Sequence, residues 1–173
     1  MRENRLEDDM YTPLDILPKL WCKPHYLHDI YLIGSLRNPQ VPVIENKLAE
    51  AGFKVFAEWF AGGELADDAW RDYEKGKGHS FKEALGTYYA KHIFEFDKRH
   101  IDRSRIGVLV APTGRSGHLE LGYMLGQGKP GFILIEDDPE RFDVMYQFAM
   151  VVNTVGELLD GLDHWYPLSI GDK

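Results

Sequence analysis

Short apolar segments alternate with longer amphipathic segments along this chain. Apolar runs with the length of buried strands occupy positions 29–34, 53–57, 105–112 and 131–136, with a shorter run near 150–152. In the segments between and after them, apolar positions recur every three to four residues, which predicts helices over about 41–51, 81–103, 115–128 and 154–166. The alternation of strand and helix is typical of βαβ units. We therefore expect an α/β sandwich built on a five-stranded parallel sheet.

One domain accounts for most of the chain. With 173 residues and 44% apolar content, the chain can bury a single core, which we place in residues 29–166. The preceding residues 1–28 contain three prolines and predict an irregular arm, and 167–173 predict a short tail. Residues 58–80 form a polar insertion that is too long for an ordinary connection, and such segments are usually lids, binding loops or disordered.

The charge and cysteine content exclude several classes of function. A formal net charge of −8 and a pI near 5.3 argue against a basic face for duplex nucleic acid, so any phosphate binding is expected to be local. Cys22 is the single cysteine, which excludes an internal disulfide framework. The apolar runs are too short to span a membrane, and the charged first residues do not resemble a secretion signal. A cytoplasmic location is expected.

Three motif matches fail on their context. The segment GQGKPG at 126–131 fits G-x-G-x-x-G, but it lies between a helix and a strand, so we interpret it as a helix stop. Lys129 is followed by Pro130 and lacks the upstream glycine of a phosphate-binding loop. His118 and Glu120 form an H-x-E pair, but no P-C-x-x-C follows to complete a zinc site. We expect no metal and no cofactor.

Glu120 is the most informative candidate for chemistry. It belongs to RSGHLELGYMLGQGKP (115–130), which follows the third predicted strand, and we place it in the first turn of the next helix. Helix N-termini at the carboxyl edge of a parallel sheet attract anions, so a carboxylate there is expected to stay ionised and to be able to act as a nucleophile. An acid in a first helical turn is also common for its dipole interaction alone, worth about 0.3–1 kcal/mol.

Two segments in this order resemble one family. IYLIGSLRN (30–38) together with GHLELGYMLGQGKP (117–130) is similar to the nucleoside 2-deoxyribosyltransferase superfamily, including its 2′-deoxynucleoside 5′-phosphate N-hydrolase branch, over about 29–159. The resemblance implies a flavodoxin-like (Rossmann-like) three-layer sandwich. It also implies that Glu120 attacks the anomeric carbon of a deoxyribosyl group, which agrees with the need for a carboxylate where positive charge develops on a sugar.

The resemblance further implies a second carboxylate near the end of the helix before the third strand. Asp97 matches best by its place in the pattern, but two extra residues separate it from the strand, so Asp102 is a rival. Both aspartates also fit a solvated face in the charge-rich run DKRHIDRSR.

The loop after the first strand supplies candidate substrate contacts. Gly34 permits close backbone approach, while Ser35, Arg37 and Asn38 can contact phosphate or sugar oxygens. GSLRN resembles the corresponding loop of the nucleotide hydrolases, which implies a 5′-monophosphate substrate. Arg37 fits nearly as well in an exposed loop, paired with an acid. Tyr31 either lines the pocket, as the resemblance implies, or fills the core.

Further candidates flank the glutamate and follow the fourth strand. Ser116, Gly117 and His118 are expected near the substrate, although His118 and Leu119 are larger than the residues of many relatives. The family forms dimers or larger oligomers, so the resemblance implies a homo-oligomer in which Met145, Tyr146 or Asn153 reaches a neighbour's pocket. Trp59, Phe60 and Trp70 of the insertion either stack on a base or, more often for such residues, fold the insertion onto the body.

The functional hypothesis is an enzyme that cleaves the N-glycosidic bond of a (deoxy)nucleoside or its 5′-monophosphate, transferring the sugar to another base or to water. Glu120 is the nucleophile, and Asp97 orients the sugar or transfers a proton. Two alternatives stay open, a non-catalytic nucleotide-binding or sensing module and an NAD-type glycohydrolase. The base, the sugar and the acceptor are not determined by the residues.

Overall fold

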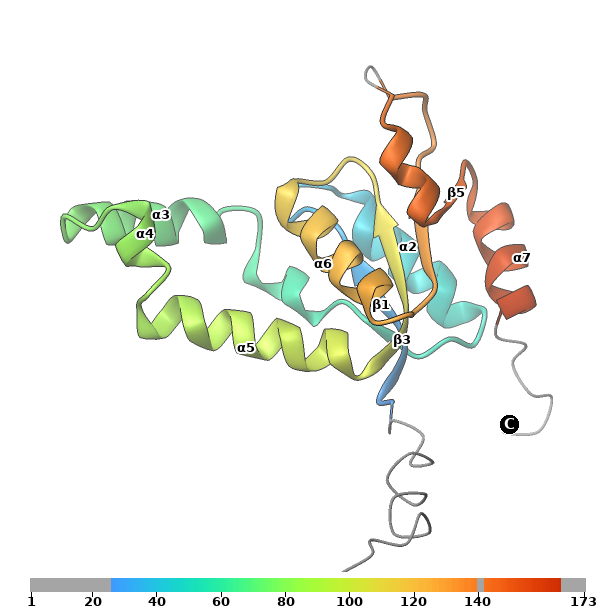
Figure 1. Ribbon diagram of the computed structural model, residues 1–173, viewed down its shortest axis with the longest axis horizontal. Helices are drawn as coiled ribbons and strands as arrows, with labels where there is room; N and C mark the ends of the chain where they lie inside the picture. Colours follow the sequence, from blue (N-terminus) through green and yellow to red (C-terminus); the bar gives the residue numbers. More distant parts are fainter. Residues whose placement is uncertain (1–25, 140–141, 166–173) are drawn as a thin grey trace, which may run out of the picture.

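The computed structural model describes residues 26–139 and 142–165, and its centre is a five-stranded sheet (Figure 1). The strands are β1 (His28–Ile33), β2 (Val55–Phe56), β3 (Ser104–Val110), β4 (Gly131–Leu134) and β5 (Met150–Val152). Their order is β2-β1-β3-β4-β5, and every pairing is parallel. The predicted five-stranded parallel α/β sheet is confirmed. The arm and the tail lie outside the described residues, apart from the last three residues of the arm.

Helices cover both faces of this sheet, as a three-layer flavodoxin-like fold requires. They are α2 (Gln40–Glu50), α3 (Ala66–Gly76), α4 (Phe81–Ala84), α5 (Tyr88–Asp102), α6 (Arg115–Gly126) and α7 (Val155–Trp165). Two 3₁₀ segments, η2 (Glu58–Gly62) and η3 (Val144–Phe148), complete the described elements. None of the helices in these ranges has the length and apolar character needed to cross a bilayer.

The alternation of side chains along the strands divides the core into two parts. On β1, Ile30 and Leu32 face the layer of α2 and α7, whereas Tyr31 and Ile33 face the layer of α5 and α6. This period of two follows from the pleat of a strand, and both faces are apolar because both are covered. All four side chains are at most 1% exposed.

Two glycines end helices where the sequence predicts. Gly52 and Gly128 have φ values of 98° and 75°, a conformation that favours glycine. After each glycine the next residue donates its N–H to a carbonyl of the preceding turn, Phe53 to Leu48 at 3.1 Å and Lys129 to Met124 at 3.2 Å. This is the Schellman arrangement. The interpretation of GQGKPG as a helix stop is confirmed.

The prediction of one continuous helix over 81–103 is wrong. The structure divides it into α4 and α5, separated by residues 85–87. Thr87 is the N-cap of α5 and its Oγ1 accepts the N–H of Ala90 at 3.5 Å. The start of α4 carries a capping box between Ser80 and Glu83. The chain therefore turns at Gly86 before α5 runs toward the sheet.

The insertion is helical rather than irregular. Within residues 58–80 the structure forms η2 and the eleven-residue helix α3, which Figure 1 shows extending away from the sheet with α4. Trp59 fixes the beginning of the insertion to the body, because its Nε1 donates to the carbonyl oxygen of Leu32 at 2.8 Å. The buried carboxylate of Glu74 accepts a hydrogen bond of 2.6 Å from His79 Nδ1 at the other end of α3. For Trp59, packing on the body is the observed arrangement.

Candidate active site

Glu120 lies in the second turn of α6, and the prediction of a first-turn position is wrong. The helix begins at Arg115, with Gly114 as N-cap, so Glu120 is its sixth residue and its first turn has no acid. At this position Glu120 lines a cavity together with residues of α5. The residues of α5, rather than the N-terminus of α6, therefore surround the carboxyl group and influence its protonation.

Glu120 and Asp97 open into the same cavity between α5 and α6. The cavity has a volume of about 230 Å³ and is lined mainly by apolar and aromatic side chains around the two acids. The lining residues are Phe94, Asp97, Lys98, Ile101, Leu119, Glu120 and Tyr123. Within the described residues, neither acid has a hydrogen bond or an ion pair, although Lys98 lines the same cavity. The two carboxyl groups are thus available to a ligand.

Burial and mutual repulsion change the protonation of the pair. Burial, and then the charge of Asp97, raise the pKa of Glu120 to about 7. Burial raises the pKa of Asp97 to about 6. Two neighbouring carboxyl groups in a partly apolar cavity ionise with difficulty together, so near neutral pH the pair holds about one proton. The expectation of an ionised Glu120 was based on a first-turn position, which Glu120 does not occupy, and burial favours the protonated form.

Asp102, the rival of Asp97, is engaged elsewhere. Its carboxylate accepts hydrogen bonds from Lys98 Nζ at 2.6 Å, Tyr123 Oη at 2.9 Å and Gln127 Nε2 at 2.8 Å. Partial burial alone would raise its pKa, but these donors outweigh burial and lower the pKa. Asp102 therefore joins α5 to α6 as an ionised structural group, while Asp97 has no such partner.

Tyr31 fills the core, the second of its two interpretations, and lies near the acid pair without lining the cavity. Its ring stacks on Phe56 with centroids 5.4 Å apart, and the residue is 1% exposed. Burial, then the negative charges of Glu120 and Asp97, raise the pKa of its hydroxyl strongly. The hydroxyl therefore stays protonated and can donate to an ionised carboxylate.

Two of the predicted substrate contacts in the loop after β1, Gly34 and Asn38, have structural roles within the chain. Asn38 is buried; its Nδ2 donates to the carbonyl oxygen of Pro112 at 3.3 Å and its Oδ1 accepts the N–H of Gln40 at 3.0 Å. It joins the loop to the end of β3 and starts α2. Gly34 allows α2 to lie close, since a Cβ there would be 2.5 Å from Val41 Cγ2. Both residues shape the loop.

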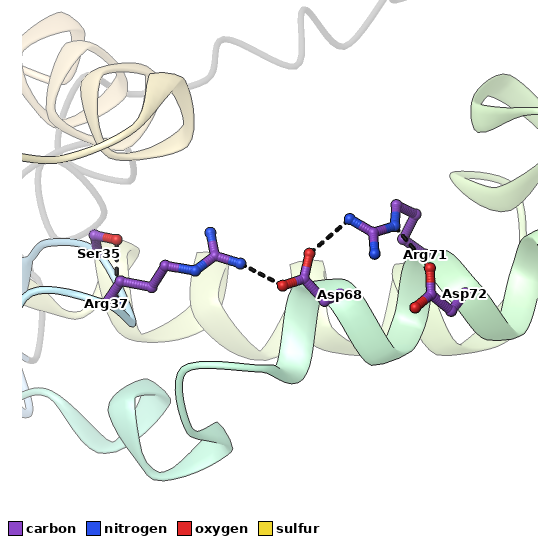
Figure 2. Close-up of polar contacts among 5 residues, drawn as sticks. All are labelled: Ser35, Arg37, Asp68, Arg71 and Asp72. Atoms are coloured by element: carbon purple, nitrogen blue, oxygen red, sulfur yellow. Dashed lines mark hydrogen bonds and ion pairs between the residues drawn. The ribbon is translucent and has the colours of Figure 1, made fainter.

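Arg37 is the exposed cation of this loop, and Figure 2 shows its guanidinium directed at α3. Its Nη2 donates to Asp68 Oδ2 at 2.6 Å, while its backbone N–H donates to Ser35 Oγ at 3.2 Å. The alternative interpretation, pairing with an acid, is the arrangement observed. Arg37 is 56% exposed at its side chain, so solvent and solutes still reach it.

The first turn of α6 contacts η3 of the same chain. His118 Nδ1 donates to the carbonyl oxygen of Gly114 at 2.9 Å, and the hydroxyl of Tyr146 donates to His118 Nε2 at 2.8 Å. Tyr146 therefore packs within its own chain, and so does Asn153, whose Nδ2 donates to the carbonyl oxygen of Ile135 at 2.8 Å. Two other candidates are exposed: Ser116 in the first turn of α6 and Met145 on η3.

Gly117 sets how closely α6 approaches β1. A Cβ at this position would lie 2.7 Å from Thr113 Oγ1 and 3.0 Å from Ile33 Cγ2, whereas a Cβ at Gly122 of the same helix would meet nothing within 4 Å. We expect Gly117→Ala to lower the free energy of unfolding by about 1–3 kcal/mol. The matched variant Gly122→Ala should raise it by about 0.5–1 kcal/mol, through helix propensity. Urea unfolding measures the free energy of unfolding of both variants. Equal stability of Gly117→Ala and Gly122→Ala would contradict the close packing at Gly117.

The raised pKa of Glu120 predicts a pH-dependent cost to folding. The folded chain keeps a proton that the unfolded chain loses between the ordinary value of 4.5 and about 7, so stability falls as pH rises through this window. Glu120→Gln is therefore expected to raise the free energy of unfolding by about 1–3 kcal/mol at pH 8 and by about a quarter of that at pH 5. Urea unfolding at both pH values measures this gain. An equal gain at the two pH values, or the same gain in the exposed control Glu95→Gln, would contradict the assignment.

The described residues contain no group of three or more histidine, cysteine, aspartate or glutamate side chains placed to hold a metal ion. Comparison with known protein families finds none that matches this chain, and comparison with curated protein sequences finds no match either. The fold and the cavity define the class of protein as a flavodoxin-like α/β protein with an acid pair at one helix-covered face of its sheet.

Proposed function

We propose that this protein cleaves the N-glycosidic bond of a (deoxy)nucleoside or of its 5′-monophosphate, with Glu120 as nucleophile. The observation that carries the proposal is the acid pair itself. Glu120 and Asp97 come from two helices, share one cavity of about 230 Å³, and have no internal counter-ion among the described residues. Such a pair makes folding less favourable above neutral pH, so a purely structural role gives no reason for it.

The proposed reaction gives the two carboxyl groups different roles, one as nucleophile and one as proton donor. As the C1′–N bond breaks, its electron pair leaves with the base and positive charge develops on the sugar. The ionised carboxylate of Glu120 bonds to C1′ and forms a glycosyl ester, while a proton from Asp97 neutralises the departing base. An incoming base or water then gives a proton to the Asp97 carboxylate as it attacks C1′, the ester bond breaks, and Glu120 returns as a carboxylate. The pair holds about one proton near neutral pH; since the pKa of Glu120 is the higher of the two, the reactive form, with Glu120 ionised and Asp97 protonated, is the minor one.

The surroundings of the pair support a nucleoside as substrate. Phe94, Leu119 and Tyr123 supply the apolar and aromatic walls of the cavity, against which a flat base can pack. Tyr31 supplies a protonated hydroxyl on the sheet side, which can hold the Glu120 carboxylate in position. Tyr31, Leu119 and Tyr123 belong to the two segments that resemble the nucleoside 2-deoxyribosyltransferase superfamily, and Phe94 lies outside them.

A substrate panel tests the proposal. The full chain is incubated with deoxynucleosides, their 5′-monophosphates, ribonucleotides and NAD, each with and without a free acceptor base, and base release is followed by chromatography. Release from a deoxynucleoside or its monophosphate is the expected result. Release from NAD alone would support the NAD-type glycohydrolase. Ligand binding with no base release from any member would overturn the enzymatic proposal in favour of a nucleotide-binding module.

A further inference from the structure

A histidine pair, His28 and His100, joins the last turn of α5 to the beginning of β1. His28 is the first residue of β1, His100 belongs to the last turn of α5, and His28 Nε2 lies 3.1 Å from His100 Nδ1. One of these two nitrogens carries the hydrogen and the other accepts it, because two facing donors or two facing acceptors cannot form a hydrogen bond.

The histidine pair belongs to an aromatic cluster that reaches the neighbourhood of the acid pair. The ring of His100 stacks on Phe56 of β2 with centroids 3.9 Å apart, and Phe96 of α5 lies 4.7 Å from His100. Phe56 also stacks on Tyr31, whose hydroxyl is affected by the charges of the acid pair. Asp97 lies one helical turn before His100 on α5. The position of His100 therefore influences where α5 places Asp97.

Apart from the polar contacts of Asp102 with α6, few buried contacts hold α5 to the body. Among the residues of α5, all of which the structure describes, only Ile101 is buried. In the first two turns Tyr88 and Phe94 are 85% and 64% exposed, and Figure 1 shows this part of the helix extending away from the sheet. A helix with few buried apolar contacts opens at a low cost in free energy, so one contact at its attached end has a large influence on it.

The geometry of the histidine pair limits the number of protons that it can hold. One added proton leaves the hydrogen bond in place, because an imidazolium still donates to a neutral imidazole. A second added proton turns both facing nitrogens into donors and brings two positive charges together, so the bond is lost. His28 Nδ1 is buried and has no hydrogen-bond partner in the part of the chain that the structure describes, so no acceptor compensates a proton there.

The surroundings of the histidine pair favour its neutral form. Burial, then the charge of His100, lower the pKa of His28 from 6.5, and burial also lowers the pKa of His100. The surrounding acids that raise a pKa of the pair are Glu58 of η2 and Asp29 of β1, and the cations that lower one are Lys54, Arg99 and Arg103. Because the folded chain binds these protons less well than the unfolded chain, the stability that the pair provides is complete above pH 6.5 and is lost as the pH falls below it.

We propose that the histidine pair is a pH-sensitive contact, which holds the end of α5 on β1 near neutral pH and releases it in acid, when both histidines are protonated. Release of α5 moves Asp97 away from Glu120, so His28 and His100 are positioning residues for Asp97. The contact and its release do not depend on the function proposed above, whereas their effect on base release rests on it.

Hydrogen exchange tests the release of α5 in the absence of any reaction. The chain that carries Glu120→Gln and Asp97→Asn has no titrating acid pair. After correction for the intrinsic rate, amides in the last two turns of α5 should exchange about tenfold faster at pH 5 than at pH 7, and amides of α7 equally fast at both.

Three further substitutions in this chain assign the pH response. His28→Gln can still donate to His100 but binds no proton, and His100→Phe keeps a ring against Phe56, so each should abolish the difference in exchange. His92→Gln, on the exposed part of α5, is the matched control and should preserve it. The proposal would be overturned if α5 showed no difference between the two pH values, or if the difference persisted in His28→Gln or His100→Phe or disappeared in His92→Gln.

The pH profile of base release tests the positioning of Asp97. His100→Phe lacks the hydrogen bond at every pH, so kcat/KM should fall by about tenfold at pH 7. Both limbs of the profile should move to lower pH, because a looser α5 leaves the two carboxyl groups better solvated. A loss of folded protein alone would lower the whole profile and leave its limbs in place, which would overturn the positioning role. His92→Gln should change neither the rate nor the limbs.

The two experiments separate the histidine contact from the proposed function. Faster exchange of α5 in acid, without base release from any substrate, would support the pH-sensitive contact and overturn only the enzymatic function. Base release without a pH-dependent change in the exchange of α5 would overturn the contact and leave the enzymatic function in place.

Discussion

Replacement of Glu120 by glutamine is expected to reduce base release by at least about a thousandfold, equivalent to ~4 kcal/mol of lost transition-state stabilisation. Glutamine keeps the size of the side chain but cannot form the glycosyl ester. Since Glu120 has no hydrogen bond or ion pair among the described residues, the substitution removes chemistry without removing a contact. Steady-state release of free base, measured by chromatography on a substrate that the panel identifies, gives the comparison.

The smaller variant Glu120→Ala makes this test specific to a nucleophile. Added formate can enter the vacated space and supply a carboxylate, so partial recovery of base release is expected with Glu120→Ala and not with Glu120→Gln. Mass spectrometry of the wild-type chain without an acceptor base should show a covalent sugar adduct on the peptide that contains Glu120. Full activity of Glu120→Gln, or an adduct on another residue, would contradict the assignment. Glu95→Gln, an exposed glutamate on α5, is the charge control.

Replacement of Asp97 by asparagine is expected to reduce base release by about a hundredfold and to change its pH dependence. Base release in the wild-type chain requires Glu120 ionised and Asp97 protonated. This one-proton form exists between the two ionisations of the pair, so the rate should rise near pH 6 and fall near pH 7. These values predict a narrow optimum between pH 6 and 7. In Asp97→Asn the basic limb should disappear.

The pH profile of the same variant also tests whether the charge of Asp97 raises the pKa of Glu120. The charge of Asp97 contributes to the raised pKa of Glu120, so base release in Asp97→Asn should rise in a single limb at a pKa below about 7. Asp102→Asn is the matched control on the same helix. It breaks contacts to Lys98, Tyr123 and Gln127, so it should lower stability while the limbs of the profile stay in place. A hundredfold loss in Asp102→Asn with Asp97→Asn unaffected would exchange the roles of the two aspartates.

Local signals account for the parts of the fold that were predicted correctly. The strand-length apolar runs became β1 to β5, because a strand covered on both faces has to be apolar along its length. The stops at Gly52 and Gly128 followed from the left-handed conformation that glycine adopts readily. The break between α4 and α5 was missed, although Gly86 followed by Thr87 is a local signal for a turn and a new N-cap.

The helix α3 was also missed, and its sequence contains signals that could have identified it. Two aspartates stand in its first turn and a lysine in its last, an arrangement that complements the helix dipole. The contact of α3 with Arg37, made through Asp68 beside Arg71, could not be predicted from such local signals. That contact joins residues 31 positions apart, and no local pattern specifies which acid an exposed arginine meets.

The sequence by itself determined the strands, most of the helices and the parallel sheet, because periodicity and helix stops depend on residues close together in the chain, and it singled out Glu120 with two candidate aspartates. Only the tertiary structure decided which aspartate faces Glu120, since Asp97 and Asp102 lie five residues apart on one helix and differ only in what packs against them. It also decided the protonation of the pair. The packing of α5 against α6 desolvates both carboxyl groups, and desolvation, which no local pattern encodes, raises their pKa values.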